Sequence, residues 1–169
     1  MPAELSIERD LLQYVEDHRH DLIALIQDLV RIPSENTPPS GAEAACQRYC
    51  RDYLEACGLQ TDLYELSEVE GLASHPLFFP GRDYSGRPNL AATLKGGDGL
   101  SLVLSGHIDT VPRGAMPWSS DPFSGHIDNG LLYGRGSNDM KAGVATNLFI
   151  ARAFHDLGLQ PFEIGRAHV

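Results

Sequence analysis

The chain has 169 residues, of which 42% are hydrophobic and 21% are charged, and its formal net charge is −10. This balance is typical of one globular domain with a hydrophobic core rather than of a disordered chain. An acidic chain lacks the basic stripe of a nucleic-acid or anionic-membrane surface, so we expect neither partner. The sequence has no signal-peptide pattern and no apolar run that approaches a membrane span, which predicts a soluble cytoplasmic protein.

A long amphipathic helix is predicted at the start of the chain. Ser6 can cap a helix that begins at Ile7, and apolar residues then recur with a helical period to about Val30. Pro33 disfavours helical backbone at the residue before it. Residues 33–41, which hold three prolines, are therefore expected to form a loop.

A second helix is predicted over residues 42–56, with Gly58 as its C-terminal cap. The three cysteines of the chain, Cys46, Cys50 and Cys57, are spaced by four and seven residues, the spacing of one stripe of a helix. An odd number of cysteines without metal-type pairing predicts small buried thiols in a reducing compartment.

The middle of the chain is predicted to supply the strands. Candidate strands cover residues 59–66, 90–94 and 101–105, with an irregular connection over 67–88 and a glycine-rich turn over 96–99. The apolar run at residues 102–104 predicts a strand buried at the centre of a sheet. Residues 125–128 and 131–133 flank Asn129-Gly130, which predicts a hairpin.

A third helix is predicted over residues 141–157 and ends at Gly158. Helices before and after a set of strands indicate an α/β fold. We expect a mixed central sheet with helices on both faces, and we expect this α/β sandwich to be incomplete within the chain.

The first residues with distinctive chemistry follow the strand at 101–105. His107 and Asp109 are two residues apart, so an extended backbone points both side chains to the same face. A neutral imidazole is a good zinc ligand when a carboxylate holds its other ring nitrogen. The pair is therefore a candidate metal ligand with its orienting carboxylate, or else a hydrogen-bonded surface pair.

The pentapeptide SGHID occurs twice, and its second copy offers an alternative ligand. His126 and Asp128 of that copy lead directly into the predicted hairpin turn, so we expect them to be exposed. They lack the buried strand that would fix ligand geometry, which favours His107. A single-metal hydrolase that uses His107 together with His126 is the alternative.

Asp139 follows the glycine-rich loop of residues 134–138 at the start of the third helix. Small residues let the backbone approach a ligand closely, which makes Asp139 a second candidate ligand. Simple capping of the helix is the alternative. The loop matches neither a phosphate-binding loop nor a dinucleotide fingerprint, so no further cofactor-binding residue is predicted.

Two stretches together resemble the signature of a zinc metallopeptidase family. They are SGHIDTVP at residues 105–112 and YGRGSNDMKAG at residues 133–143, and Trp118, residues 121–123 and Gly130 between them also fit. The family includes acetylornithine deacetylase, succinyl-diaminopimelate desuccinylase, aminoacylase and carboxypeptidase G. The likeness covers most of the chain and implies the α/β sandwich of a zinc peptidase.

The resemblance implies a role for each candidate residue. His107 and Asp139 would be metal ligands, Asp139 would bridge two ions, and Asp109 would be the catalytic-site residue that orients His107. The peptide bond from Asp139 to Met140 would be cis, as it often is in the family. The implied cofactor is Zn²⁺, two per complete active site, with Co²⁺ or Mn²⁺ as alternatives.

The resemblance also implies that the chain carries only part of an active site. In the family a Glu-Glu pair follows the bridging aspartate and supplies the general base and a further ligand. A later acidic ligand, a histidine and an inserted dimerisation domain complete the enzyme. Since a catalytic zinc site usually has three protein ligands, we expect weak or no metal binding and no hydrolysis by this chain alone.

Residues 1–162 are accordingly predicted to be the N-terminal part of the catalytic domain. Residues 163–169 can be back-translated to the opening of a sequencing-library adapter, which predicts a non-native tail. An ordinary C-terminus or a cloning scar is the alternative.

The predicted activity is metal-dependent hydrolysis of the amide bond of an N-acyl amino acid or a small peptide. Residues 78–84 resemble stretches in relatives of the deacetylase-like and desuccinylase-like members, which favours that branch of the family. The resemblance also implies that the complete protein is a homodimer acting on such small molecules. The alternative is a non-catalytic, truncated interaction module. It is disfavoured because residues 102–104 would then expose an unpaired apolar strand.

Overall fold

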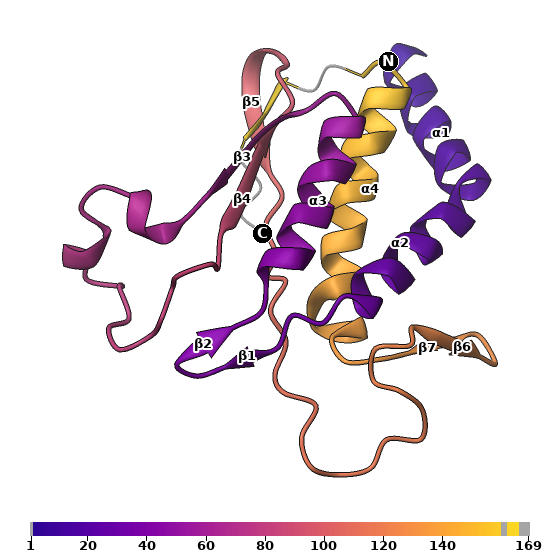
Figure 1. The fold of residues 1–169 in the computed structure, drawn as a ribbon. Coiled ribbons are helices and arrows are strands. Elements are labelled where there is room, and N and C mark those ends of the chain that lie inside the picture. The colour runs from indigo at the N-terminus through magenta and orange to yellow at the C-terminus, as the bar shows by residue number, and fades with distance from the viewer. Residues whose placement is uncertain (1, 160–161, 166–169) are drawn as a thin grey trace.

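The computed structural model describes residues 2–159 and 162–165 of the chain. Its larger helices lie on one side of the strands (Figure 1). The bounds of the helices are α1 Pro2–Asp17, α2 Arg19–Arg31, α3 Ala44–Ala56 and α4 Ala142–Asp156. The short helical turns are η1 Leu66–Glu68, η2 Leu72–Ser74 and η3 Ser137–Lys141.

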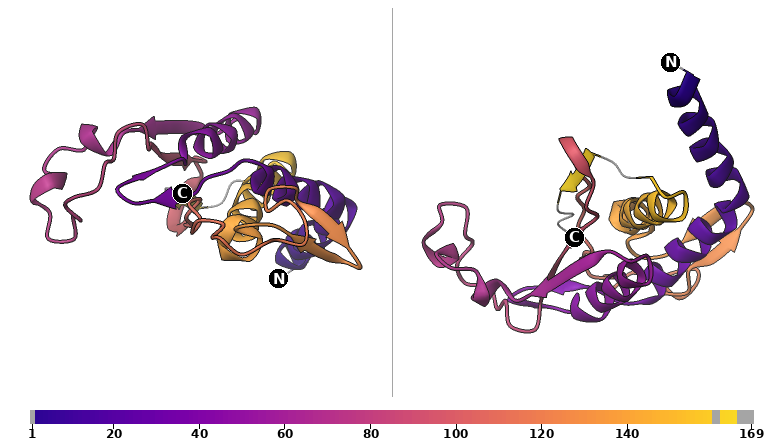
Figure 2. Two further views of the ribbon diagram at one scale, coloured as in Figure 1. Left: turned by 60° about the horizontal axis from the view of Figure 1, so that its bottom comes forward. Right: turned by 90° about the horizontal axis from the view of Figure 1, so that it is seen from above.

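The predicted single helix over residues 7–30 is wrong in one respect, because the structure divides it into α1 and α2. The break falls at His18, whose backbone (φ −112°, ψ 15°) leaves the helical region. The ring of His18 stacks on that of Tyr14 with 4.0 Å between centroids, and its Nδ1 lies 3.0 Å from the Tyr14 carbonyl oxygen. Ser6 lies inside α1 and does not cap it. The break lets α1 lead away from the other helices (Figure 2).

The hydrophobic core lies between α2, α3, α4 and strand β4 (Asn89–Thr93). As predicted, Cys46, Cys50 and Cys57 are buried and form no disulfide. Leu29, Cys46, Cys50, Leu90 and Val144 are fully buried members of this core. These side chains fasten α3 and α4 against the strands and so fix the backbone that leads into the candidate site.

Among the described residues, the strands form separate two-stranded sheets, one parallel and the others antiparallel, which confirms the α/β class. Strand β3 (Gln60–Tyr64) pairs antiparallel with β4, and β5 (Gly97–Val103) pairs parallel with β8 (Phe162–Gly165). Among the described residues, α3 and α4 lie on the same side of these strands (Figure 1), as part of an α/β fold that is incomplete within the chain.

Strand β5 departs from the prediction in two ways. It begins at Gly97, so residues 97–99 belong to a strand rather than to the predicted turn. Leu102 and Val103 are 44% and 56% exposed, in place of the predicted central burial. Among the described residues, β5 belongs to a two-stranded sheet with β8 and is not a central strand of a larger sheet, in agreement with the exposure of Leu102 and Val103.

The predicted hairpin is confirmed. Strands β6 (His126–Asp128) and β7 (Leu131–Tyr133) pair antiparallel, and both turn residues have a positive φ, 49° at Asn129 and 78° at Gly130. These values are the ones that a two-residue hairpin turn requires. A smaller pair, β1 (Asn36–Thr37) and β2 (Ser40–Gly41), lies within the predicted loop of residues 33–41.

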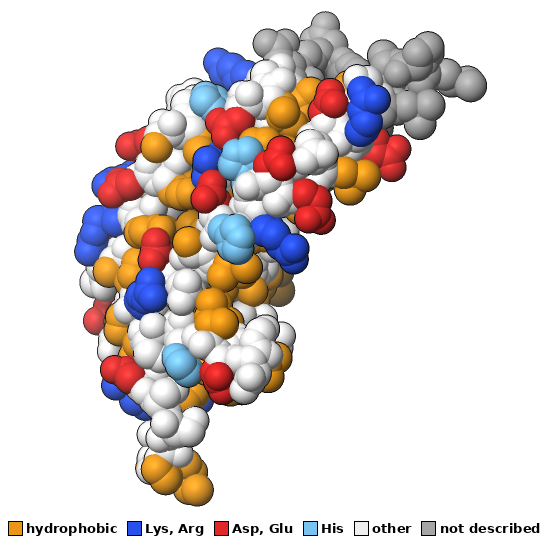
Figure 3. Space-filling view, turned by 90° about the vertical axis from the view of Figure 1, so that its right-hand side faces the viewer, with side chains coloured by type: hydrophobic (Ala, Val, Ile, Leu, Met, Phe, Trp, Pro, Cys, Tyr) orange, Lys and Arg blue, Asp and Glu red, His pale blue; other side chains and the backbone are white. Residues whose placement is uncertain are grey.

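The helical side of the molecule is drawn in Figure 3. Acidic, basic and apolar side chains are interspersed on this face, without a continuous stripe of either charge. Among the described residues, no helix combines the length and the apolarity that a membrane crossing requires. Of the predicted non-native tail, residues 163–165 belong to β8 and residues 166–169 lie outside the described part, so that hypothesis stays a prediction.

Candidate metal site

The candidate site begins where the chain leaves β5. Ile108 and Thr110 are buried, whereas His107 and Asp109 are partly exposed, so the two polar side chains share one face as the spacing predicted. The buried Ser34 hydroxyl donates to the Ile108 carbonyl oxygen at 2.6 Å, and the Thr110 N–H donates to the Ser34 carbonyl oxygen at 2.9 Å. These bonds fix the backbone that presents His107.

Both ring nitrogens of His107 face carboxylates of the predicted site. Nδ1 lies 3.1 Å from the Asp109 carbonyl oxygen and 3.1 Å from the Asp109 carboxylate, and Nε2 lies 3.0 Å from Oδ1 of Asp139. Burial lowers the pKa of His107, but the hydrogen bonds and charges of the two aspartates outweigh it and raise that pKa overall. The structure therefore brings together all three residues that the sequence singled out.

Asp139 reaches His107 from a loop that packs closely against the segment of residues 107–110. Gly136 has φ 81°, and a side chain there would collide with the methyl group of Thr110. The Asp139–Met140 peptide bond is cis, as the resemblance implied. The Asp139 side chain is 81% exposed, so its carboxylate is accessible from solvent.

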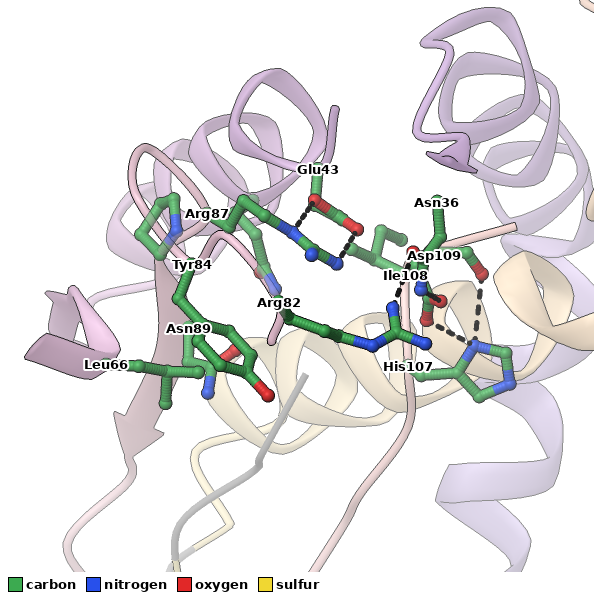
Figure 4. Close-up of a pocket in the computed structure, with 12 residues that line it drawn as sticks. Asn36, Glu43, Leu66, Arg82, Tyr84, Arg87, Asn89, His107, Ile108 and Asp109 are labelled. Atoms are coloured by element: carbon green, nitrogen blue, oxygen red, sulfur yellow. Dashed lines mark hydrogen bonds and ion pairs between the residues drawn. The ribbon is translucent and has the colours of Figure 1, made fainter. Parts of the chain in front are cut away.

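A second set of polar residues, which the sequence did not single out, holds Asp109 from the other side (Figure 4). Asn36 Nδ2 donates to Oδ2 of Asp109 at 2.8 Å, and Arg82 Nη1 donates to Oδ1 of Asn36 at 2.8 Å. These groups line a cavity of about 330 Å³ that reaches His107. The sequence signal for these two residues was weak. Asn36 lies in a predicted loop, and Arg82 lies in a predicted irregular connection, within residues 78–84, whose likeness to other members indicated no contact with the site.

The same cavity is bounded by a buried ion pair. Arg87 donates to the Glu43 carboxylate through two bonds, of 2.9 Å from Nε and 2.6 Å from Nη2, and both side chains are largely buried. The bond to Glu43 raises the pKa of Arg87. This bidentate pair ties the start of α3 to the segment before β4 and holds the cavity wall.

The donor set fits one edge of a zinc site. Two ligands about 2.0–2.1 Å from a tetrahedral zinc ion lie about 3.3 Å from each other, close to the 3.0 Å between His107 Nε2 and Asp139 Oδ1. In the part of the chain that the structure describes, no three His, Cys, Asp or Glu side chains converge as a ready metal-binding set. His107 and Asp139 are thus two facing donors that need further ligands.

The second SGHID copy is placed differently. His126 lies in β6, and its ring stacks on that of Tyr133 in the partner strand at 6.2 Å between centroids. All three residues of β6 are exposed, as was expected for this copy. His107, and not His126, is the histidine that contacts Asp139.

Comparison with known proteins agrees with this geometry. Residues 103–165, which contain His107, Asp109 and Asp139, match peptidase family M20/M25/M40. This part of the chain is therefore similar to that family. The match begins at the last residue of β5 and continues through His107, Asp109, Asp139, α4 and β8.

Similar proteins extend the M20/M25/M40 likeness toward the N-terminus. The chain is 32% identical over 161 residues to N-formyl-4-amino-5-aminomethyl-2-methylpyrimidine deformylase of Halalkalibacterium halodurans, covering 93% of this chain and 34% of the relative. It is 38% identical over 134 residues to succinyl-diaminopimelate desuccinylase of Methylobacterium radiotolerans, covering 79% of this chain and 30% of the relative. The chain thus spans about a third of the length of these relatives.

Solved structures support the M20-type fold. Human carnosine dipeptidase 1 superposes with a TM-score of 0.72 at 22% identity, over 95% of this chain and 33% of that protein. An M20 family metallo-carboxypeptidase from Sulfolobus solfataricus superposes with a TM-score of 0.66 at 19% identity, over 87% of this chain and 30% of that protein. At these identities the likeness establishes the fold.

Proposed function

We propose that this chain supplies part of the active site of a zinc-dependent amidohydrolase. The observation that carries the proposal is the position of His107, with one ring nitrogen against Asp139 and the other against Asp109. An imidazole held in this way at Nδ1 presents its Nε2 toward a metal ion. The match of residues 103–165 to a peptidase family supports the same conclusion.

Each residue has a distinct task in this proposal. His107 and Asp139 hold the metal, and Asp109 orients the His107 ring by accepting a hydrogen bond from Nδ1. When bound, zinc supplies Lewis acidity toward a water molecule and the amide carbonyl. Asp139 is exposed enough for its carboxylate to contact a second ion. The general base and the remaining ligands are supplied by residues other than those of this chain.

The proposed substrates are N-acyl amino acids or small peptides. The named activities of the two relatives, removal of a formyl and of a succinyl group, favour cleavage of an acyl-amide bond. We propose that the complete protein is a homodimeric, cytoplasmic enzyme of this class, with Zn²⁺ as its metal and Co²⁺ or Mn²⁺ as substitutes. The chain by itself is proposed to bind metal weakly or not at all and to hydrolyse no substrate.

The test joins this chain to the remaining two thirds of the Methylobacterium relative. Hydrolysis of N-succinyl and N-formyl amino acids is measured for the fusion and for the chain alone. We expect zinc-dependent hydrolysis by the fusion, a loss of at least about 100-fold on His107→Ala or Asp139→Asn, and none by the chain alone. A fusion whose activity survives both substitutions would show that these residues are not metal ligands.

A further inference from the structure

Asn36 occupies an unusual position between two charged side chains that lie far from it in the sequence. It is 73 residues from Asp109 and 46 residues from Arg82, yet it hydrogen-bonds to both at 2.8 Å. Together with the contacts of His107, these bonds form a continuous chain from Arg82 through Asn36 and Asp109 to the candidate ligand (Figure 4).

The chemistry of the two neighbours fixes the orientation of the Asn36 amide. A guanidinium group only donates hydrogen bonds, and an ionised carboxylate only accepts them. The Asn36 oxygen must therefore face Arg82, and its NH₂ group must face Asp109, as the structure has it. Arg82 thereby prevents the amide from turning over and presenting its oxygen to the carboxylate.

Asp109 divides its two carboxylate oxygens between its partners. Oδ2 accepts from Asn36 at 2.8 Å, and Oδ1 lies 3.1 Å from Nδ1 of His107. A carboxylate held at one oxygen cannot rotate freely about its terminal bond. The bond from Asn36 therefore keeps the other oxygen directed at the imidazole.

Arg87, in the wall of the same cavity, differs from Arg82 in its hydrogen-bond partners. Its guanidinium makes two bonds to the buried Glu43 carboxylate. Arg82 instead bonds to a neutral amide and lies over the Phe79 ring at 5.6 Å. The contacts of Arg82 are directed toward the site, because its amide partner in turn holds Asp109.

We propose that Asn36 and Arg82 are positioning residues that hold Asp109, and through it the ring of His107, in the geometry for metal binding. This inference rests on the proposed function, because it assigns the network to the same metal site. Groups that orient a metal-bound histidine from behind typically change metal affinity by about 10-fold to 100-fold.

The experiment uses the 169-residue chain with ¹³C,¹⁵N-labelled histidine. Three-bond couplings report the side-chain rotamer of His107 without metal, and paramagnetic broadening of its signals reports the Co²⁺ dissociation constant. The first variant, Asn36→Leu, keeps the size of the side chain and removes the bonds to Asp109 and Arg82. The second, Arg82→Met, removes only the bond from Arg82 to Asn36. Asn89→Leu is the matched control, because Asn89 lines the same cavity outside this hydrogen-bond chain.

A positioning role predicts that Asn36→Leu and Arg82→Met broaden the rotamer distribution of His107 and weaken Co²⁺ binding by about 10-fold. Asn89→Leu should change neither. In an Asp109→Ala background, Asn36→Leu should have no further effect, because the residue through which it acts is gone. A structural role would lower stability equally in both backgrounds.

The proposal is overturned if the His107 rotamer is unchanged in Asn36→Leu, or if the effect persists without Asp109. Should Asn36→Leu fail to fold by circular dichroism, Arg82→Met carries the same test. If the rotamer responds as expected but hydrolysis by the fusion survives both His107→Ala and Asp139→Asn, the positioning role stands and the metal site of the proposed function is wrong.

Discussion

The side-chain ammonium group of Lys141 donates a hydrogen bond of 2.8 Å to the backbone carbonyl oxygen of Leu29, in the last turn of α2. It also donates to the Ile32 carbonyl oxygen at 2.6 Å, and the residue is fully buried. The C-terminal end of a helix carries partial negative charge, which favours a cation there. Burial nevertheless lowers the pKa of Lys141. Lys141, two residues after Asp139, thus fastens the segment that carries Asp139 to the C-terminal end of α2.

Replacing Lys141 with Met should lower the free energy of unfolding by about 1–3 kcal/mol, because two buried carbonyl groups lose their donor. Urea unfolding followed by circular dichroism measures this change. The matched control is Lys95→Met, which alters an exposed lysine and should cost less than about 0.5 kcal/mol. Equal losses for the two variants would show that the buried bonds contribute nothing specific.

The Glu43–Arg87 pair should be far more sensitive than an exposed pair. Glu43→Gln leaves a buried guanidinium without its counter-charge, which costs about 3–5 kcal/mol for pairs of this kind. Asp52→Asn removes the exposed partner of Arg51 and should cost about 1 kcal/mol or less. Thermal or urea unfolding of both variants measures these costs. Similar small decreases in the free energy of unfolding would contradict a stabilising role for the buried Glu43–Arg87 pair.

Gly136 should tolerate substitution less well than Gly130. Both have a positive φ, 81° and 78°, so alanine at either position carries a backbone cost of about 1–2 kcal/mol. A side chain at Gly136 also meets Thr110, whereas one at Gly130 meets nothing within 4 Å. Gly136→Ala should therefore destabilise the chain more than Gly130→Ala, as measured by unfolding. It should also shift the NMR signals of His107, which Gly130→Ala should leave in place.

A pH-dependent contribution to stability is expected where α1 meets α4. The Tyr14 hydroxyl donates to Asp156 at 2.6 Å, and this bond, with those from His155 and Arg152, lowers the pKa of Asp156. Since the folded pKa is below the unfolded one, this stabilisation is present above about pH 4 and is lost as the pH falls through the folded pKa.

Tyr14→Phe should consequently lower the free energy of unfolding by about 1–2 kcal/mol at pH 7 and by less at pH 3. Urea unfolding at the two pH values checks this. Tyr133→Phe, which removes a hydroxyl from a partly exposed tyrosine in β7, should have little effect at either pH. A Tyr14→Phe deficit that is the same at pH 3 and pH 7 would rule out the linkage to Asp156.

The two histidines of the repeated pentapeptide should differ sharply in metal binding. His107→Ala should abolish whatever Zn²⁺-induced shifts the chain shows at residues 107–110 and 134–139, because one of two facing donors is lost. His126→Ala should leave them unchanged, since His126 lies in an exposed strand against Tyr133. Nuclear magnetic resonance titration with Zn²⁺ measures both. Loss of the shifts in His126→Ala would instead support the alternative in which His107 and His126 bind one metal ion together.

The sequence alone determined the features that depend on neighbouring residues. The hairpin around Asn129-Gly130 follows from turn chemistry, and the helix over 141–157 follows from apolar periodicity. The common face of His107 and Asp109 follows from the two-residue repeat of extended backbone. These signals are local, because backbone preferences and side-chain direction are set within a few residues.

The tertiary structure alone decided which distant residues meet. Asn36 and Arg82 reach Asp109, and Lys141 reaches Leu29 across 112 residues, although no local pattern marks any of them as partners. The break at His18 and the exposure of Leu102 and Val103 were likewise not predicted, because helix breaks and burial depend on which distant elements pack against a segment. Such contacts depend on how the whole chain packs, and short-range periodicity carries no information about partners dozens of residues away.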